Sequence, residues 1–545
     1  MLRIVIIGGG FAGAFAAKHL RKKFSDTAQV ELFNSTNYFV FQPLLPEVAS
    51  GTISAQDAVT PLRIMLPGVK VRMAEVRSVD FENNLIHFIQ GSKKIPQQIE
   101  YDHLVLTCGQ EANLAMLPGF AEHSLAMKNL ADAHELRNHI IQCLEHADIT
   151  NNASIKQRLL TFVVAGAGFS GVETIGEMFE MLRRTIKYYP NISPEELKGI
   201  IVQRDERILT ELPNSLSDYA SKILSKRGID IRTSTSIEYA SNTSITLDNG
   251  EVIDTSTLVT TVGNGPGALV KSLPIELERG KIPTNEFMQV RGCDNVWSLG
   301  DTALIPLGKK ENSQDQIYAP PTAQFAVQEA KQLAKNIHNH MHDKAIKPFT
   351  YKPKGSLASI GNYKAVAELF GIRFSGLPAW LLWRTFYIGM LPGFVTRLRV
   401  ALNWLLDFFV PRNIVQISNQ SNRANNNYEC YAKGEVIYEA GQIIEGLYTV
   451  VSGSLESKTK QDSGEDFIRV LKPGDHWGER TIFSDFTTVS ALTALEDSKV
   501  LILKRDVFQQ LQQSFPPFEK YFSGIKEDVY PEQLRKPINN GVSDE

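Results

Sequence analysis

The sequence predicts an α/β fold in which two parallel-sheet domains are followed by a helical segment and a β-rich module. Two glycine-rich turns about 160 residues apart carry this prediction, because each follows an apolar, strand-like run and precedes a helix-like segment. Alternation of strand, turn and helix is typical of parallel sheets covered by helices. The length of 545 residues also exceeds what one hydrophobic core usually serves.

The first turn runs from Gly8 to Gly13 and predicts a phosphate-binding site. It follows the strand-like run 2–7 and precedes the helix-like run 14–24. Gly8 permits a tight turn, Gly10 lets a pyrophosphate approach the backbone, and Gly13 lets helix and strand pack closely. The N-terminus of the helix offers free N–H groups and a positive dipole to the phosphates. The other positions of this turn that we expect at the site are Phe11 and Ala12.

The second turn repeats this pattern in the middle of the chain. Gly166, Gly168 and Gly171 follow the strand-like run 161–165 and precede the helix-like run 172–187. Two such units predict two dinucleotides that meet head to head, in Rossmann domains arranged as in glutathione reductase. The other positions of this turn that we expect at the site are Phe169 and Ser170.

A distant segment decides which unit holds which dinucleotide. Residues 294–301 form an apolar run that ends in Gly-Asp, and Asp301 is expected beside the ribityl chain and pyrophosphate of a flavin. The first unit is completed by this segment, whereas the middle unit is a self-contained insert. We therefore expect FAD to stay bound in the first unit and a nicotinamide dinucleotide to exchange in the second. Further expected positions are Val76, Gly109 and Ala323 at the FAD site and Gly263 at the nicotinamide site.

The residues at the ends of the second strands depart from the usual acidic ribose-binding residue. The first unit has Asn34, which can still hydrogen-bond a ribose hydroxyl. The second unit has Gln203 followed by Arg204. A carboxylate repels a 2′-phosphate, whereas a neutral Gln beside a cationic Arg accepts one, so NADPH is an alternative to NADH. The other interpretation is that Arg204 only faces solvent.

Composition excludes several other classes of protein. A net charge of −3 gives no reason to expect nucleic acid as a partner. The four cysteines lie far apart and form no CxxC pair, which argues against a disulfide framework, a metal site and a dithiol centre. The chain opens on a strand-like run without a signal segment, which favours a cytoplasmic protein. No apolar stretch is long enough to span a bilayer, so any membrane contact is expected to be peripheral.

With these motifs in place, residues 1–417 resemble the type II NADH:quinone oxidoreductases, which are single-subunit respiratory dehydrogenases that do not pump protons. The matching segments, which occur in the order typical of that family, are 37–45, 47–51, 118–123, 171–173, 300–301, 321–328 and 355–361. The resemblance implies ping-pong chemistry. Hydride passes from nicotinamide C4 to flavin N5, and two electrons and two protons then pass to a membrane quinone.

The same resemblance implies roles for five further residues. Gln324 and Gln328 share one helix face and would line the quinone pocket, and Glu329 stands where relatives often carry another Gln and would alter the polarity of that pocket. Glu173 would have a raised pKa and relay protons. Lys364 would lie near the anionic edge of the reduced flavin.

An aromatic-rich stretch suggests how the protein reaches a lipid-soluble quinone. Residues 379–410 contain three of the five tryptophans, Trp380, Trp383 and Trp404, interleaved with arginines. Pro392-Gly393 splits the stretch into two amphipathic helices that suit the headgroup layer of a bilayer. We expect peripheral binding to the cytoplasmic side of the cell inner membrane. The alternative is a helical pair that packs on its own core or in a dimer interface. The arginines are Arg384, Arg397 and Arg399.

A polar linker, residues 418–427, separates a C-terminal module, residues 428–525, from the rest, and a tail, residues 526–545, follows it. The module resembles a cyclic-nucleotide-binding domain, an all-β roll with flanking helices, in segments 434–441, 447–453, 471–475 and 477–479. Functional members carry Gly-Glu followed about ten residues later by Arg. Here Glu479 is present, but Thr488 occupies the Arg position and Arg480 would need a different geometry. A degenerate module kept for dimerisation or docking is therefore favoured over a cAMP or cGMP sensor.

The predicted domains are 1–150 and 271–348 for FAD, 151–270 for NAD(P)H, and 349–417 for membrane contact, and we expect a homodimer. Two rival functions remain. A sulfide:quinone oxidoreductase shares this fold but needs cysteines next to the flavin, whereas Cys108 and Cys293 flank strands and Cys143 lies on a connecting helix. A regulatory flavoprotein would sense pyridine nucleotides without rapid turnover.

Overall fold

A computed structural model describes most of the chain. The described residues are 2–25, 27–91, 94–309, 315–416, 428–442, 444, 446–460, 466–478, 488–504 and 507–508. The predicted linker and tail, as well as Glu479 and Arg480, lie outside these residues. The chain forms two compact units, the first made of residues 1–116, 125–236 and 257–416 and the second of residues 117–124, 237–256 and 417–545.

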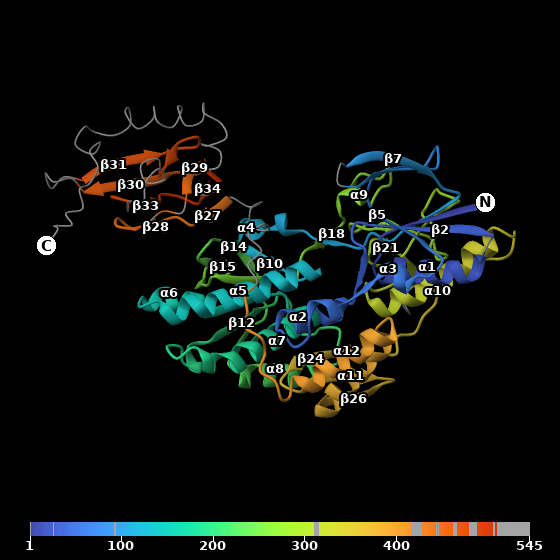
Figure 1. The fold of residues 1–545 in the computed structure, drawn as a ribbon, viewed down its shortest axis with the longest axis horizontal. Coiled ribbons are helices and arrows are strands. Elements are labelled where there is room, and N and C mark those ends of the chain that lie inside the picture. Colours follow the sequence, from blue (N-terminus) through green and yellow to red (C-terminus); the bar gives the residue numbers. More distant parts are fainter. Residues whose placement is uncertain are drawn as a thin grey trace. The chain divides into compact units, whose positions relative to one another are not determined.

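The first unit contains a seven-stranded sheet with the strand order β20-β8-β1-β2-β5-β6-β7 (Figure 1). Strand β20 pairs in parallel with β8, so the distant segment that ends in Gly300-Asp301 completes this sheet, as the sequence predicts. Strands β5 to β7 continue it as antiparallel neighbours. The bounds are β20 Val296–Ser298, β8 His103–Leu106, β1 Leu2–Ile7, β2 Ala28–Asn34, β5 Lys70–Asp80, β6 Leu85–Gln90 and β7 Ile95–Glu100.

Two helices cover one face of this sheet and lie side by side (Figure 1). They are α1, Phe11–Phe24, and α10, Ala323–His340. Helix α1 begins at Phe11 rather than at residue 14, because the last residues of the glycine-rich turn already form its first turn. Its alanines and Leu20 are buried against β1 and α10.

A second sheet carries the second glycine-rich turn. Its strand order is β10-β17-β11-β12-β13, and β17, β11, β12 and β13 run parallel to one another. Helix α7 follows β11 and starts at Phe169, again earlier than the sequence predicts. The bounds are β10 Ser124–Ala126, β17 Thr257–Thr260, β11 Thr161–Ala165, β12 Lys198–Val202, β13 Ile229–Arg232, α5 Leu130–Ile149, α7 Phe169–Thr185 and α8 Asn214–Lys226.

A small antiparallel sheet leads into the two aromatic-rich helices. It consists of β24 Gly355–Gly361, β25 Lys364–Leu369 and β26 Ile372–Gly376. Helices α11, Leu377–Met390, and α12, Phe394–Leu406, follow, so the predicted break at Pro392-Gly393 is confirmed. Strand β24 packs closely on α7, because a Cβ on Gly176 would lie 2.6 Å from the Ile360 carbonyl oxygen. None of the described helices is both long and apolar enough to cross a membrane.

The C-terminal module is a β-roll of two antiparallel four-stranded sheets, which confirms its predicted class of fold. The sheets have the orders β27-β34-β29-β32 and β28-β33-β30-β31. Tyr438, Tyr448 and Trp477 stack against one another inside the roll, with ring centroids 5.5 to 5.9 Å apart. The bounds are β27 Tyr428–Tyr431, β28 Val436–Tyr438, β29 Gly446–Ser452, β30 Leu455–Lys460, β31 Asp466–Leu471, β32 His476–Trp477, β33 Ser490–Ala494 and β34 Ser498–Lys504.

Candidate active site

The first glycine-rich turn has the geometry of a phosphate cradle. Gly8 has φ +107°, and a Cβ there would lie 2.2 Å from the Thr107 carbonyl oxygen. A Cβ on Gly13 would lie 1.9 Å from the Gly8 carbonyl oxygen, so strand and helix touch at this point. A Cβ on Gly10 would meet no described protein atom within 4 Å. The first and third glycines are therefore required by the fold, whereas the middle one leaves space for a ligand.

The second turn has the same division of roles. A Cβ on Gly166 would lie 2.4 Å from the Val262 side chain, and one on Gly171 would lie 1.8 Å from the Gly166 carbonyl oxygen. A Cβ on Gly168 would meet no described atom within 4 Å. Gly10 and Gly168 are also the N-cap residues of α1 and α7, and no described side chain caps either helix. Each cradle therefore offers open backbone N–H groups to a pyrophosphate.

An amide side chain braces each cradle. The Asn34 Oδ1 accepts the Gly9 N–H at 2.8 Å, and the Gln203 Oε1 accepts the Ala167 N–H at 2.8 Å. The other end of the Gln203 amide donates to the Asp205 carboxylate at 2.6 Å. Sequence analysis missed both the bracing role and Asp205, because a turn displaces the carboxylate three residues beyond the end of β12, which is Val202. Arg204 is exposed.

The Gly300-Asp301 turn packs directly on the first cradle. A Cβ on Gly300 would lie 2.7 Å from the Ala12 Cβ, and the Thr302 hydroxyl donates to the Gly109 carbonyl oxygen at 3.0 Å. The structure thus gathers Ala12, Gly109 and Asp301 around the N-terminus of α1. The other predicted positions are placed as follows. At the FAD site, Phe11 packs on Phe39 and Phe41, Val76 is buried beside Phe88, and Ala323 starts α10. At the nicotinamide site, Gly263 follows β17 with φ +76°, and Ser170 is exposed in α7.

Glu329 does not face the predicted quinone pocket. Its Oε2 accepts the Gly300 N–H at 2.7 Å, and the side chain is buried. Neighbouring residues on a helix point about 100° apart, so Glu329 faces the Gly300 turn while Gln328 does not. Burial, with a smaller contribution from Asp301, raises the pKa of Glu329 to about 7 despite the lowering by the Gly300 hydrogen bond. This carboxyl supports the FAD-site turn rather than changing the polarity of a quinone pocket.

Glu173 is a buried acid on α7 that retains its proton at neutral pH. Its Oε1 accepts the Ser359 N–H at 3.0 Å and the Trp383 indole N–H at 3.0 Å. Burial raises the pKa of Glu173 to about 8 and outweighs the lowering by these two hydrogen bonds, while Glu47 and Glu177 add smaller raising contributions. The residue therefore connects α7 to β24 and to α11.

Strand β24 joins three of the predicted catalytic positions. At its start, the Gln324 amide donates to the Gly355 carbonyl oxygen at 3.1 Å and accepts from the Tyr351 hydroxyl at 2.8 Å. Glu173 bonds Ser359 within the strand, and Lys364 pairs with Gly361 at its end. Gln324 and Lys364 are thus attached at opposite ends of β24, about 20 Å apart along the strand. Gln328 is half-buried on α10.

The three tryptophans predicted as membrane contacts are buried instead. Trp380, Trp383 and Trp404 are 6%, 1% and 4% exposed. The Trp404 indole donates to the Glu47 carboxylate at 2.6 Å, and the Arg384 guanidinium lies 4.1 Å and 4.4 Å from the ring centroids of Trp380 and Trp404. The prediction that these tryptophans contact the membrane is wrong, because Trp383 and Trp404 donate to buried carboxylates and Trp380 packs on the Arg384 guanidinium. Arg384 itself lies 3.7 Å from the Glu47 carboxylate.

Sequence analysis also missed the other buried carboxylates. Glu173, Glu177 and Glu180 lie on one face of α7, and Glu47 lies on α2, Leu45–Ala49. Glu177 accepts from the Ser50 hydroxyl at 3.1 Å, and burial raises the pKa of Glu47 to about 7. The available signal was three glutamates at spacings of four and three residues on an otherwise apolar helix face.

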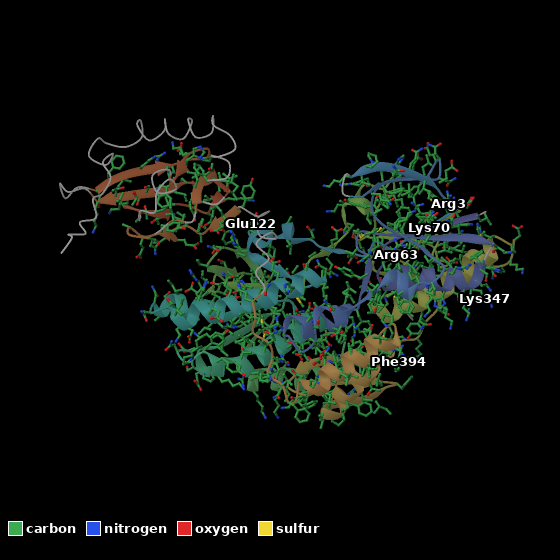
Figure 2. The ribbon with its side chains drawn as sticks, in the orientation of Figure 1. Arg3, Arg63, Lys70, Glu122, Lys347 and Phe394 are labelled. Atoms are coloured by element: carbon green, nitrogen blue, oxygen red, sulfur yellow. The ribbon has the colours of Figure 1, made fainter. Side chains whose placement is uncertain are left out.

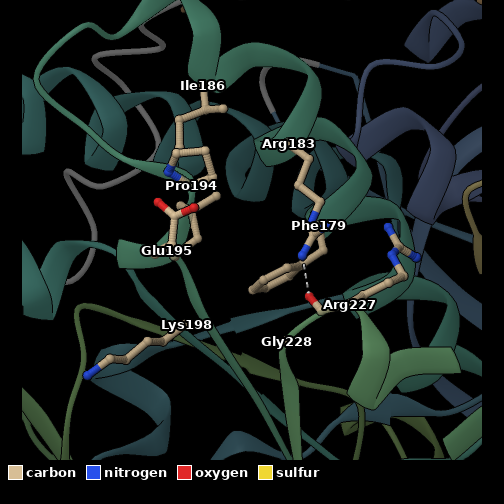
Figure 3. A pocket seen from close by; sticks show the side chains of 9 residues that line it. Phe179, Arg183, Ile186, Pro194, Glu195, Lys198, Arg227 and Gly228 are labelled. Carbon is tan, nitrogen blue, oxygen red and sulfur yellow. Dashed lines mark hydrogen bonds between the residues drawn. The ribbon is translucent and has the colours of Figure 1, made fainter. Parts of the chain in front are cut away.

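A separate hollow of about 580 Å³ opens elsewhere on the nicotinamide-binding half (Figure 3). Lys198 begins β12 and Gly228 precedes β13, so this pocket lies at the amino ends of the strands, opposite to the glycine-rich turns. The Arg183 side chain crosses it to donate to the Arg227 carbonyl oxygen at 2.7 Å. The pocket is therefore not part of the dinucleotide sites.

Comparisons with known proteins agree with this geometry. A family described as pyridine nucleotide-disulphide oxidoreductase matches residues 2–330, and the NDH2 C-terminal domain matches residues 354–413. A type II NADH:quinone oxidoreductase of Mycobacterium tuberculosis is 30% identical, over 75% of this chain and 89% of that protein. The chain belongs to the type II NADH:quinone oxidoreductase family. The cyclic nucleotide-binding domain family matches residues 428–515, as predicted for the module.

Further relatives of this type II NADH:quinone oxidoreductase agree with that membership. A demethylphylloquinone reductase of Synechocystis is 29% identical, over 74% of this chain and 95% of that protein. The structure of NDH2 from Plasmodium falciparum in complex with NADH covers 76% of this chain and 99% of that chain, with 20% identity and a TM-score of 0.70. The latter likeness shows the fold alone.

Membership of the type II NADH:quinone oxidoreductases confirms an enzyme with FAD as cofactor and NADH as substrate, in agreement with the two cradles. A sulfide:quinone oxidoreductase of Aquifex aeolicus shares the fold, with 18% identity and a TM-score of 0.58 over 77% of this chain and 96% of that chain. Burial raises the pKa of the Cys108 thiol to about 12, which opposes the nucleophilic thiolate that sulfur transfer needs.

The two end glycines and the middle glycine of the first cradle should respond differently to substitution. Gly10→Ala is expected to leave the fold intact and to lower the FAD content of the purified enzyme severalfold, because its Cβ enters the space that a pyrophosphate needs. The flavin absorbance of the denatured protein measures this content. Gly13→Ala is the matched control and should lower the melting temperature itself, because its Cβ overlaps the Gly8 carbonyl. Full FAD content in Gly10→Ala would contradict the cradle.

Proposed function

We propose that this enzyme transfers two electrons from NADH to a quinone through FAD, by ping-pong turnover and without pumping protons. The first cradle and Asp301 would hold FAD, and the second cradle would hold the nicotinamide dinucleotide. When bound, FAD supplies two-electron redox chemistry between a hydride donor and a quinone. Gln324, Gln328 and Lys364 are proposed to lie on the quinone and flavin side of the site.

The buried acid Glu173 carries this proposal. A quinone needs two electrons and two protons to become a quinol, but a hydride brings two electrons and only one proton. Glu173 holds a proton at neutral pH, because burial raises its pKa to about 8. Trp383 and Ser359 fix its position by hydrogen bonds to one carboxyl oxygen. We infer that Glu173 supplies the second proton and recovers it from solvent afterwards.

Glu173→Gln should separate the two halves of the reaction. The variant keeps the hydrogen-bond acceptor but cannot release a proton, so quinone reduction should slow by about 100-fold while NADH still reduces the flavin at the parent rate. In the parent, the quinone half-reaction should slow as the pH rises through about 8, because the carboxyl then loses its proton. Stopped-flow absorbance measures both half-reactions. An unchanged quinone half-reaction with its pH step retained would contradict the role of Glu173.

We propose NADH rather than NADPH as the preferred donor. The Gln203 amide is committed to Ala167 and to Asp205, so it is not free to receive a 2′-phosphate. Asp205 brings a carboxylate to this edge, and a carboxylate binds the ribose hydroxyls of NADH and repels the 2′-phosphate of NADPH. Arg204 is exposed and is the residue through which NADPH would have to bind.

We propose that the C-terminal module binds cyclic nucleotides weakly or not at all. Thr488, at the expected arginine position, is buried and neutral. Its hydroxyl donates to the Ser490 carbonyl oxygen at 3.1 Å, and its backbone bonds Gln442 and Gly441. This position therefore offers no charge to a cyclic phosphate, whose binding depends on charge-assisted hydrogen bonds.

Steady-state quinone reduction with NADH and NADPH, each with and without cAMP, tests these assignments together. We expect kcat/KM for NADH to exceed that for NADPH by at least about tenfold, and Asp205→Asn to reduce this ratio by about tenfold. cAMP should change neither rate. Arg204→Ala is the matched control and should leave the ratio unchanged. The NADH assignment is wrong if NADPH is preferred and Arg204→Ala abolishes that preference, and a chain that reduces no quinone would refute the function.

We propose that α11 and α12 bind the bilayer surface with leucines and phenylalanines instead of the buried tryptophans. Phe394, Leu398, Leu402 and Leu405 lie at spacings of four, four and three residues and form one stripe along α12. Phe394, labelled in Figure 2, is the first residue of α12. It is 79% exposed, and the three leucines are 48 to 55% exposed. Val400 and Trp404 form the opposite, buried face. An exposed apolar stripe of this kind suits an interfacial helix.

Leu398→Asn combined with Leu402→Asn should weaken binding to vesicles of phosphatidylethanolamine and phosphatidylglycerol by about 100-fold, because two leucines no longer enter the apolar layer. Vesicle flotation measures the bound fraction. Ile149→Asn is the matched control, since Ile149 at the end of α5 is more exposed than either leucine but lies outside the stripe. Equal flotation of both variants would refute the stripe.

The predicted homodimer and the predicted location on the cytoplasmic side of the inner membrane stay predictions.

A further inference from the structure

Strand β27 pairs with β34 on one side, and its outer edge is bonded by segments that lie outside the roll in the sequence. Within the second unit, the Cys430 N–H donates to the His123 Nε2 at 2.8 Å, and the Cys430 carbonyl oxygen accepts the Asn242 N–H at 3.1 Å. His123 ends the short helix α4, Phe120–His123, and Asn242 lies in the turn between β14, Ile237–Ala240, and β15, Ser244–Leu247. Both backbone groups of a buried roll residue are thus satisfied from outside the roll.

Side chains around Cys430 reinforce this contact. The Lys499 ammonium on β34 lies 2.6 Å from the Glu122 carboxylate on α4, which raises the pKa of Lys499. The Thr243 hydroxyl donates to the Glu435 carboxylate at 2.5 Å, and the Asn242 amide donates to Glu429 at 3.3 Å. Glu122 is mostly buried here (Figure 2). Charge-assisted bonds of this kind to partly buried carboxylates make a specific interface.

The two outside segments form one surface through direct contacts with each other, which do not involve the roll. A Cβ on Gly119, which has φ +77° and caps α4, would lie 1.7 Å from the Ala240 carbonyl oxygen at the end of β14. The Ala240 N–H donates to the Pro118 carbonyl oxygen at 3.1 Å. Backbone contact this close holds α4 and the β14–β15 turn together. The roll therefore engages a preformed platform, which we define as residues 117–124 and 237–256.

Residues 237–256 of the platform, which we call the platform hairpin, are joined at both ends to segments of the nicotinamide cradle. Just before β14, the Thr235 N–H donates to the Gln203 carbonyl oxygen at 3.1 Å, and the Ser234 N–H donates to the Asp205 carbonyl oxygen at 3.0 Å. After the platform segment, β17 runs to Thr260, and the hydroxyl of the next residue, Thr261, donates to the Ala165 carbonyl oxygen at 2.9 Å. The platform hairpin is thus an insertion between two segments that form the nucleotide-binding edge.

We propose that the C-terminal module docks on this platform through β27 and thereby sets the affinity of the enzyme for its nicotinamide dinucleotide. The module acts as a structural partner of the second cradle, and a cyclic nucleotide need not be bound for this role. Loss of the docking contacts frees the hairpin, and the segments around Gln203, Asp205 and Ala165 then lose a constraint. The inference goes beyond quinone reduction, because it concerns nucleotide binding and requires no turnover.

Charge reversal in the full-length protein tests the proposal. Lys499→Glu and Glu122→Lys should each increase hydrogen exchange at the Asn242 and Cys430 amides by at least tenfold, because like charges then face each other. The dissociation constant for NADH, measured by fluorescence titration, should change at least threefold, with kcat at saturating NADH unchanged. The double variant restores the opposite charges and should return both readouts toward the parent values.

Lys458→Glu is the matched control. Lys458 pairs with Asp466 at 2.7 Å within the roll, on β30 and β31, so its reversal removes an ion pair without touching the platform. It should change neither readout. Unchanged amide exchange in both single variants would overturn the docking. Faster exchange with an unchanged NADH dissociation constant would overturn the link to the nicotinamide site, and failure of the double variant to recover would show that the ion pair is not the contact.

Discussion

The burial of carboxylates on α7 governs how the rest of the first unit is arranged around the active site. A buried carboxyl group without hydrogen-bond or ion-pair partners is costly whether it is neutral or ionised, so every neighbouring element brings a donor. Trp383 and Ser359 donate hydrogen bonds to Glu173. Ser50 and Thr52 donate to Glu177. Arg184 and Arg227 form ion pairs with Glu180. Helix α11, strand β24 and the segment after α2 are therefore placed by hydrogen bonding as much as by apolar packing.

The same constraint explains the shape of the C-terminal end of this unit. Arg412 bonds Asp407 at 3.2 Å and the Ser50 carbonyl oxygen at 3.3 Å, and it lies 3.6 Å from Glu177. Arg184 reaches the same Asp407 at 3.1 Å. The chain beyond α12 is thus tied back to α7 by charges that are almost fully buried. Loss of one partner would leave the other charge buried and unpaired, which costs free energy, and this cost stabilises each of these pairs.

Sequence alone predicted the parts of the site that depend on spacing. Gly8 and Gly13, with Gly166 and Gly171 in the repeat, follow from covalent geometry, since a Cβ at these positions would overlap neighbouring atoms where strand and helix touch. The middle glycines, Gly10 and Gly168, follow from the space that a pyrophosphate needs. The return of the chain through Asp301 was also predictable, because an apolar strand preceded it. Asn34 and Gln203 were harder, because a polar residue at a strand end can turn either to a ligand or to its own backbone, and here both amides brace the cradles.

The tryptophans show what composition cannot decide. Aromatic residues alternating with arginines fit a membrane surface and a buried cation–π stack equally well. The choice depends on whether a carboxylate lies below, and Glu47 is more than 300 residues away in the sequence. Tertiary partners so distant leave no local signal. The stripe from Phe394 to Leu405 does carry a local signal, because its apolar residues recur at helical spacing. The tryptophans and arginines beside it give a stronger but misleading signal.

The stack of Arg384 between Trp380 and Trp404 has a consequence for how the enzyme meets a bilayer. Because the inner face of α11 and α12 is held together by protein contacts, these helices are folded before any lipid arrives. A segment that folds only on contact must offset its ordering entropy from the binding energy, whereas a preorganised one retains that energy as affinity. For the membrane contact that we propose, α11 and α12 would therefore present their exposed apolar stripe in an already folded form.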